Sequence, residues 1–194
     1  QPWQPIPALD SLVFPMADGI FARTDGEINA NMGAETNAVV DLNGVSMAGA
    51  AVEADLTQDG QWSVRLIANT TVAPSAATQM SGLYDPMTDS VCLAGISGAA
   101  LPNLVGDLTQ TVCVTDGQVE SIDFTGQAEV EPFGPVDMTG TYDADADRLC
   151  FEGQSATNFP GSDAPFAPRV CLGNNGQDVL PTEFNARVDL PPVG

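Results

Sequence analysis

The sequence repeats itself at a fixed interval. Residues around Cys92 recur around Cys150 at a constant offset of 58 residues (150 minus 92). A period of this length is typical of modules that bury their apolar faces against one another, and it therefore predicts a repeat architecture. The matched residues are Met80, Gly82, Tyr84, Asp85, Asp89, Cys92 and Gly95 against Met138, Gly140, Tyr142, Asp143, Asp147, Cys150 and Gly153.

A degenerate third copy precedes these two. Residues 43–46 resemble residues 94–97, and residues 54–58 resemble residues 106–110. Each copy closes on an Asp-Gly or Asn-Gly pair, ending in Gly60, Gly117 and Gly176, and such pairs favour tight hairpin turns. The expected organisation is a Pro-rich apolar arm at 1–15, β modules at 16–61, 62–118 and 119–177, and a C-terminal strand at 178–194.

The hydrophobic pattern of the clearer copies has a period of two. Leu66 and Phe124 each belong to a stretch in which apolar residues alternate with polar or small ones, as in a half-buried strand. No segment shows a capped, amphipathic helical period. We therefore predict an all-β fold of about three tandem four-stranded antiparallel modules, closed or arranged as a prism or sandwich.

The two ends of the chain predict how the repeats terminate. Phe184 and Leu190 match Phe124 and Val130, the opening strand of a module, whereas the first module lacks such a strand. Because an unpaired strand is a site of association, we expect the C-terminal strand to complete the first module, in the same chain or in a neighbour. The N-terminal arm is too rich in proline for a central strand, and it covers either its own core or an adjacent subunit. The residues expected to mediate assembly are Trp3, Leu12, Phe14, Phe184 and Leu190.

The four cysteines are spaced alike in the two later modules. Cys92 and Cys113 are 21 residues apart (113 minus 92), and so are Cys150 and Cys171 (171 minus 150). Neither cysteine of a pair has a counterpart in the first module, so we predict the disulfides Cys92–Cys113 and Cys150–Cys171. A zinc site is the alternative, but the chain has no C-x-x-C pair and no His. Two disulfides indicate an oxidising compartment.

The charge of the chain excludes several partners. Its 26 acidic residues stand against 5 basic ones, all Arg, which gives a formal net charge of -21. Such a chain is repelled by phosphate backbones, so nucleic acid is not an expected partner. The sequence contains no apolar run long enough to span a membrane, so no membrane insertion is expected. The Gln at position 1 and the predicted disulfides indicate a processed protein. We expect this protein to be secreted, exposed at the cell surface or located in a periplasm.

Few chemistries are open to a chain without His or Lys. The usual general base, the Ser-His-Asp and Cys-His systems and His-ligated metals are all excluded, so we expect no enzyme, no catalytic residues and no certain cofactor. Asp143, Asp145 and Asp147 alternate within one turn, which either holds calcium or is a solvated hairpin tip. Phe159 and Phe166 lie in a long connection and either contact a ligand, such as a glycan, or plug the module.

Three functions follow from these observations. The leading hypothesis is a structural or adhesive β-repeat protein that self-associates, as the subunit of a filament or lattice. The second is an extracellular binding module that binds carbohydrate or whose binding depends on calcium. A hydrolase that uses only carboxylates is the third.

Overall fold

The protein folds into an antiparallel β structure. The computed structural model describes residues 2–24, 27–42, 44–56, 60–72, 77–101, 104–130, 134–143, 146, 148–155, 167–173, 178–179 and 183–185. In this part of the chain the strands are hydrogen-bonded in the order β1 to β12, which is their order in the sequence, and β13 pairs with β11. The all-β prediction is thereby confirmed. The elements are the 3-10 helix η1 (Pro7–Leu9) and the strands β1 (Asp18–Thr24), β2 (Glu27–Leu42), β3 (Val45–Leu56), β4 (Trp62–Val72), β5 (Thr78–Asp85), β6 (Ser90–Leu101), β7 (Leu104–Thr115), β8 (Gln118–Val130), β9 (Gly134–Asp143), β10 (Arg148–Ser155), β11 (Ala167–Gly173), β12 (Asp178–Val179) and β13 (Glu183–Asn185).

The sheet does not close on itself within the described residues, so the expected closed arrangement is wrong. β12 and β13 both pair with β11 and not with a strand of the first repeat. Pairing with a strand that is near in the sequence closes only a short loop and costs little chain entropy, which explains why β12 and β13 continue the last repeat instead. Leu190 lies outside the described residues.

The strand register carries the sequence repeat. The pair Arg65 and Leu83 between β4 and β5 recurs at the same offset as Asp123 and Thr141 between β8 and β9. Likewise, the pair Asp85 and Ser90 between β5 and β6 recurs as Asp143 and Arg148 between β9 and β10. Equivalent positions in the two repeats therefore have equivalent neighbours, which allows one repeat to serve as a reference for the other.

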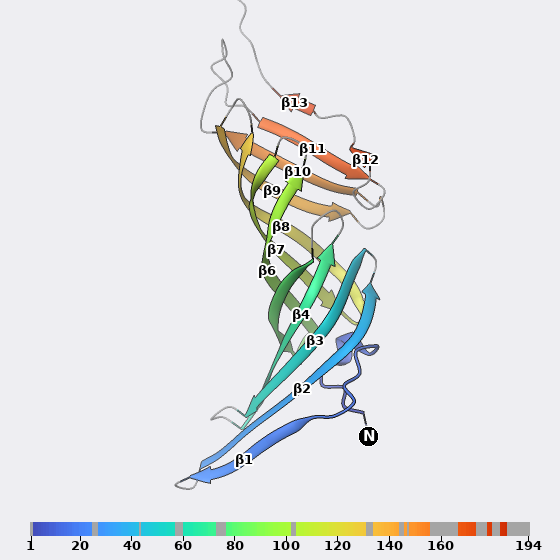
Figure 1. The fold of residues 1–194 in the computed structure, drawn as a ribbon, viewed down its shortest axis with the longest axis vertical. Coiled ribbons are helices and arrows are strands. Elements are labelled where there is room, and N and C mark those ends of the chain that lie inside the picture. The colour runs from blue at the N-terminus through green and yellow to red at the C-terminus, as the bar shows by residue number, and fades with distance from the viewer. Residues whose placement is uncertain are drawn as a thin grey trace, which may run out of the picture. The chain divides into compact units, whose positions relative to one another are not determined.

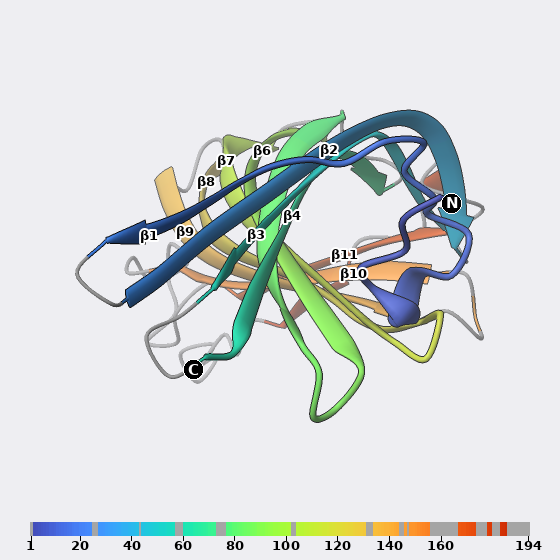
Figure 2. The same ribbon diagram turned by 90° about the horizontal axis from the view of Figure 1, so that it is seen from below.

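The chain divides into two compact units. The first comprises residues 1–72, 77–95 and 111–122, and the second comprises residues 73–76, 96–110 and 123–194. Within the first unit, Figure 1 shows β1 to β4 as neighbouring strands that alternate in direction. The register between β2 and β3 shifts between Thr36 and Val39. Figure 2 shows that β2 is strongly bent along its length.

The N-terminal arm packs into the first unit. It lies on the inner side of the bend of β2 (Figure 2), and Trp3 and Phe14 exchange two backbone hydrogen bonds of 2.9 and 3.0 Å. Full burial of each large apolar side chain contributes about 1.5–3 kcal/mol, which is enough to hold the arm in place. Of the two placements that the sequence left open, the arm therefore takes the one over its own core. Its fully buried residues are Ile6, Ala8, Leu9, Leu12 and Phe14.

The second unit has its own core on one face of β8, β9 and β10. The ring centroids of Phe124 and Phe151 lie 5.4 Å apart, with an angle of 58° between the ring planes. Leu149, two residues before Phe151 on β10, is also buried. These residues alternate with exposed ones, so the opposite face of the same strands carries polar side chains that solvent can reach.

Candidate functional site

The two predicted disulfides are confirmed. Cys92 bonds to Cys113 in the first unit, and Cys150 bonds to Cys171 in the second. Cys150 and Cys171 are direct register partners on β10 and β11, so the bond links neighbouring strands. The residues on either side of Cys92 and Cys150 are Val91, Leu93, Leu149 and Phe151, and all four are buried, so they face away from the sulfur atoms. Both disulfides therefore stand on the opposite face of their strands from these residues.

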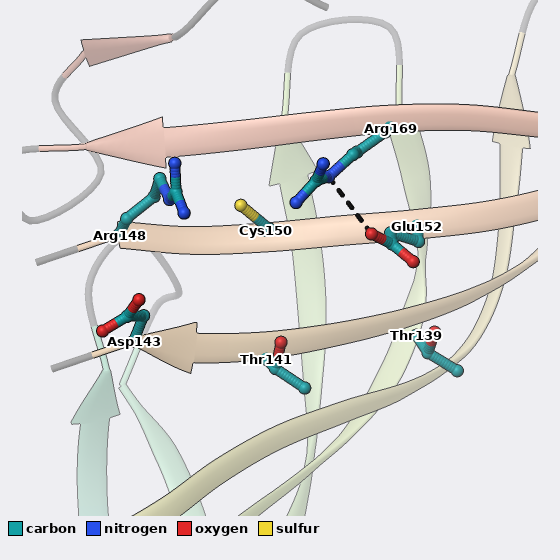
Figure 3. A pocket seen from close by; sticks show the side chains of 7 residues that line it. All are labelled: Thr139, Thr141, Asp143, Arg148, Cys150, Glu152 and Arg169. Carbon is teal, nitrogen blue, oxygen red and sulfur yellow. Dashed lines mark ion pairs between the residues drawn. The ribbon is translucent and has the colours of Figure 1, made fainter. Parts of the chain in front are cut away.

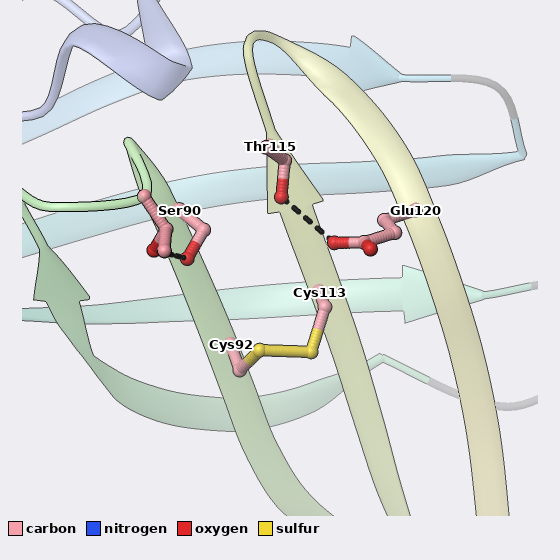
Figure 4. The surroundings of a disulfide bond; sticks show 6 residues. Ser90, Cys92, Cys113, Thr115 and Glu120 are labelled. Carbon is pink, nitrogen blue, oxygen red and sulfur yellow. Dashed lines mark hydrogen bonds between the residues drawn. A yellow bond between two sulfur atoms is a disulfide. The ribbon is translucent and has the colours of Figure 1, made fainter.

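The face around Cys92–Cys113 carries neutral hydroxyl groups and one carboxylate. The Thr115 hydroxyl donates a hydrogen bond of 2.8 Å to Oε2 of Glu120 (Figure 4). The hydroxyls of Ser90 and Thr88 lie 2.7 Å apart. All these polar groups engage one another across or along the strands. Glu120 is the one charged residue among those labelled in Figure 4, and its carboxylate is engaged by Thr115.

The face around Cys150–Cys171 is different, because charged residues flank the disulfide on both sides. Residues of β9, β10 and β11 that are register partners form three parallel rows across these strands. The rows are Thr139, Glu152 and Arg169; Thr141, Cys150 and Cys171; and Asp143, Arg148 and Gly173.

A pocket of about 220 Å³ lies over these rows. The guanidinium groups of Arg148 and Arg169 lie on either side of Cys150, with Thr141 below it in the view of Figure 3. Oε1 of Glu152 forms an ion pair with Nε of Arg169 at 3.1 Å, which orients the arginine side chain. Nε of Arg148 is shielded from solvent and has no hydrogen-bond partner in the described part of the chain. The pocket therefore presents two guanidinium groups, of which one is held in place and the other has an unsatisfied donor.

None of the residues predicted from the sequence as a site pointed to this pocket, apart from Asp143 at its edge. A signal was nevertheless present, because Arg148 and Arg169 each stand two positions before a bonded cysteine, and Glu152 stands two positions after one. In a strand, such residues share the face of the cysteine. The disulfide pairing and strand alternation together could therefore have placed all three side chains on one surface.

The predicted calcium residues are only partly described. Oδ1 of Asp143 accepts a hydrogen bond from the backbone N–H of Ala146 at 3.1 Å, as Oδ1 of Asp85 does from Met87 at 2.8 Å in the preceding repeat. Asp145 and Asp147 lie outside the described residues, and among those described no group of three metal-binding side chains occurs. Asp143 thus closes a turn, and calcium binding stays a prediction.

The remaining predicted site residues are distributed over both ends of the chain. Phe159 and Phe166, the predicted ligand loop, lie outside the residues that the structure describes. Leu12 and Phe14 are buried in the packed arm. Phe184 belongs to β13 on the β11 edge. Leu12 and Phe14 thus belong to the first unit and Phe184 to the second.

Strand β1 is a second candidate surface, in the first unit. It pairs only with β2 among the described strands, so it lies at an edge. Ile20 and Phe21 are 73% and 68% exposed on its two opposite faces, and Met16 just before it is 72% exposed. A hollow of about 610 Å³ extends from Met16 and Ile20 over neighbouring residues of β2 and β3.

Tyr84 has a raised pKa. The Tyr84 hydroxyl donates a hydrogen bond of 2.7 Å to Oδ1 of Asp89 at the β5–β6 hairpin. Burial of the phenol, and then the hydrogen bond and charge of Asp89, raise the pKa of Tyr84 to about 12. The group stays protonated at neutral pH and serves as a donor that fixes the hairpin.

Comparison with known proteins adds no assignment. No family model, no curated protein and no solved structure matches this chain. None of the helical residues described is part of a segment long and apolar enough to cross a membrane.

Proposed function

We propose that this chain is a secreted or cell-surface structural protein without catalytic activity, and that it self-associates by pairing the β1 edge with a second copy. The observation that carries the proposal is the pair of large apolar side chains exposed on this edge strand. Two intrachain disulfides also suit an oxidising compartment.

An open edge strand is a ready template for another strand. Its outward N–H and C=O groups have no sheet partner, and natural proteins usually protect such an edge with charges, prolines or a covering segment. Between Asp18 and Arg23, β1 presents the apolar side chains of Ile20 and Phe21 to solvent. Phe21 is the register partner of buried Ala30, so the two side chains lie on the same face of the sheet. The apolar surface of that face therefore extends from β2 to the exposed edge strand. An added strand would bury Phe21 together with the edge.

The charge of the chain makes this association dependent on salt. Copies with a formal charge of -21 repel one another, and the repulsion acts over a Debye length of about 10 Å at 0.1 M salt but only about 3 Å at 1 M. Apolar burial and strand pairing are not weakened in this way. We therefore expect association to increase with ionic strength, the opposite of what a complex held by salt bridges does.

Sedimentation velocity over a range of protein and salt concentrations tests the proposal. The native protein should form dimers or larger assemblies that grow with salt, and Ile20→Lys or Phe21→Lys should shift it to monomer. Met87→Lys is the matched control, because Met87 is 93% exposed at the β5–β6 turn and gains the same charge. It should leave association unchanged.

Two outcomes would refute the proposal. One is a native protein that stays monomeric at high protein and high salt concentration. The other is an assembly that Met87→Lys disrupts as strongly as the two edge variants do, because a general charge effect would then account for the result.

A further inference from the structure

We propose that the pocket over Cys150–Cys171 binds the carboxylate of a sugar-sized polyhydroxy acid, such as a uronic acid residue. The inference does not depend on self-association, because the pocket belongs to the second unit and β1 belongs to the first. It rests on the two arginines, on the hydroxyl and carboxylate groups around them, and on the preceding repeat, which lacks the arginines.

The arginines provide the site for the carboxylate. Arg148 and Arg169 are two of only five cationic side chains in the chain, yet both line the same pocket. A guanidinium group presents several donors in one plane, which matches the two oxygens of a carboxylate. Nε of Arg148 is buried without a partner in the described structure, and a shielded donor in that state costs free energy until an acceptor reaches it. A bound carboxylate is such an acceptor.

The rest of the lining suits a ligand that also carries hydroxyl groups. Thr139 and Thr141 can donate or accept hydrogen bonds, and the carboxylates of Asp143 and Glu152 can accept them from hydroxyls. A volume of about 220 Å³ is below the range of about 300–1,000 Å³ of pockets for drug-sized ligands. A single sugar-sized residue fits both the volume and the mixture of donors and acceptors better than a larger anion does.

The preceding repeat shows that the fold does not need these charges. At the offset of 58 residues, Arg148, Glu152 and Arg169 correspond to Ser90, Ala94 and Thr111 (for example, 148 minus 90). The preceding repeat has the equivalent disulfide, Cys92–Cys113. Its strands β5 and β6 also pair in the same register as β9 and β10. The three charged residues are therefore an addition to a shared scaffold, which points to recognition and not to a structural requirement.

Nuclear magnetic resonance can follow the arginines directly, because a chain with five arginines gives few side-chain Nε–Hε signals. D-galacturonate is the probe, D-galactose supplies the same hydroxyls without the charge, and acetate supplies the carboxylate alone. We expect galacturonate to shift the Arg148 and Arg169 signals saturably and to bind at least about tenfold more tightly than either control. The signals of the other arginines should not move.

Substitution toward the preceding repeat tests the assignment. Arg148→Ser and Arg169→Thr introduce the residues found at the equivalent positions, and each should weaken galacturonate binding by about tenfold or more at unchanged melting temperature. Arg65→Gln removes a charge from the first unit and should have no effect on binding.

Each other outcome counts against the proposal. The absence of saturable shifts at Arg148 and Arg169 with galacturonate would overturn it, and this test needs no variant to fold. Equal binding of acetate would overturn the sugar assignment in favour of a free small carboxylate, and equal binding of galactose would overturn the role of the arginines.

Discussion

Gly153 on β10 lies directly across from Met138 on β9. The Met138 side chain occupies the space that a side chain at position 153 would need. A Cβ atom there would approach Cγ1 of Val136 to 2.6 Å and would also collide with the sulfur of Met138, which is fully buried. In the preceding repeat, a Cβ on Gly95 would approach Cγ of buried Met80 to 2.9 Å. The recurrence of Met and Gly at the same spacing in the sequence thus reflects one packing arrangement used twice.

Gly153→Ala should destabilise the protein by about 1–3 kcal/mol, because the added methyl group overpacks a filled core. Gly33→Ala is the matched control, since a Cβ on that strand glycine meets no atom closer than 3.7 Å. Urea unfolding monitored by circular dichroism measures both. Equal stability of the two variants would show that Met138 and Val136 move aside without cost.

The Cys150–Cys171 disulfide should contribute about 3 kcal/mol to the free energy of unfolding, as a chain-entropy estimate for a loop of this size indicates. Replacing both cysteines by Ala should lower stability by that amount without changing the strand content. Peptide mapping of the non-reduced protein should recover Cys92 with Cys113 and Cys150 with Cys171. A peptide that links Cys92 to Cys150 would contradict the pairing.

The raised pKa of Tyr84 predicts a loss of stability at high pH. In the unfolded chain the phenol ionises near its ordinary pKa of 10.0, whereas in the folded protein it retains its proton up to about 12. Between these values the folded state binds more protons than the unfolded state, so stability falls as pH rises from 10 towards 12. Stability should be unaffected by this group below pH 10.

An ultraviolet titration of the phenolate absorbance checks this assignment, with Tyr84→Phe identifying the contribution of Tyr84 against that of Tyr142. Asp89→Asn removes the charge while tolerating the positive φ of 48° at that position. It should lower the pKa of Tyr84, but burial should keep it above the ordinary value. A titration curve that Tyr84→Phe leaves unchanged above pH 10 would refute the assignment.

Calcium binding at the β9–β10 turn can be decided by thermal melting. If Asp143, Asp145 and Asp147 hold the ion, millimolar calcium should raise the melting temperature relative to chelator, because a ligand that binds the folded state stabilises it. Asp145→Ala should remove most of that rise, and Asp85→Ala in the equivalent turn should not. Identical melting curves with calcium and with chelator would leave the turn as a solvated hairpin tip.

The sequence alone identified the features that depend on local pattern. The alternation around Leu66 and Phe124 assigned the buried face, and the shared spacing of Cys92–Cys113 and Cys150–Cys171 assigned both disulfides. These predictions succeeded because the period of a strand and the offset of a repeat are properties of neighbouring residues along the chain.

The tertiary structure decided which strands and side chains meet. The likeness of Phe184 to Phe124 could not reveal that β13 pairs with β11, because a strand-like sequence does not specify its partner, and pairing with the adjacent strand costs less chain entropy. Nor could the separate positions of Arg148 and Arg169 show that they flank one disulfide, which depends on the register of β9, β10 and β11. Sequence period thus determines the face on which a residue stands, whereas strand order and register, set by the whole sheet, determine its neighbours on that face.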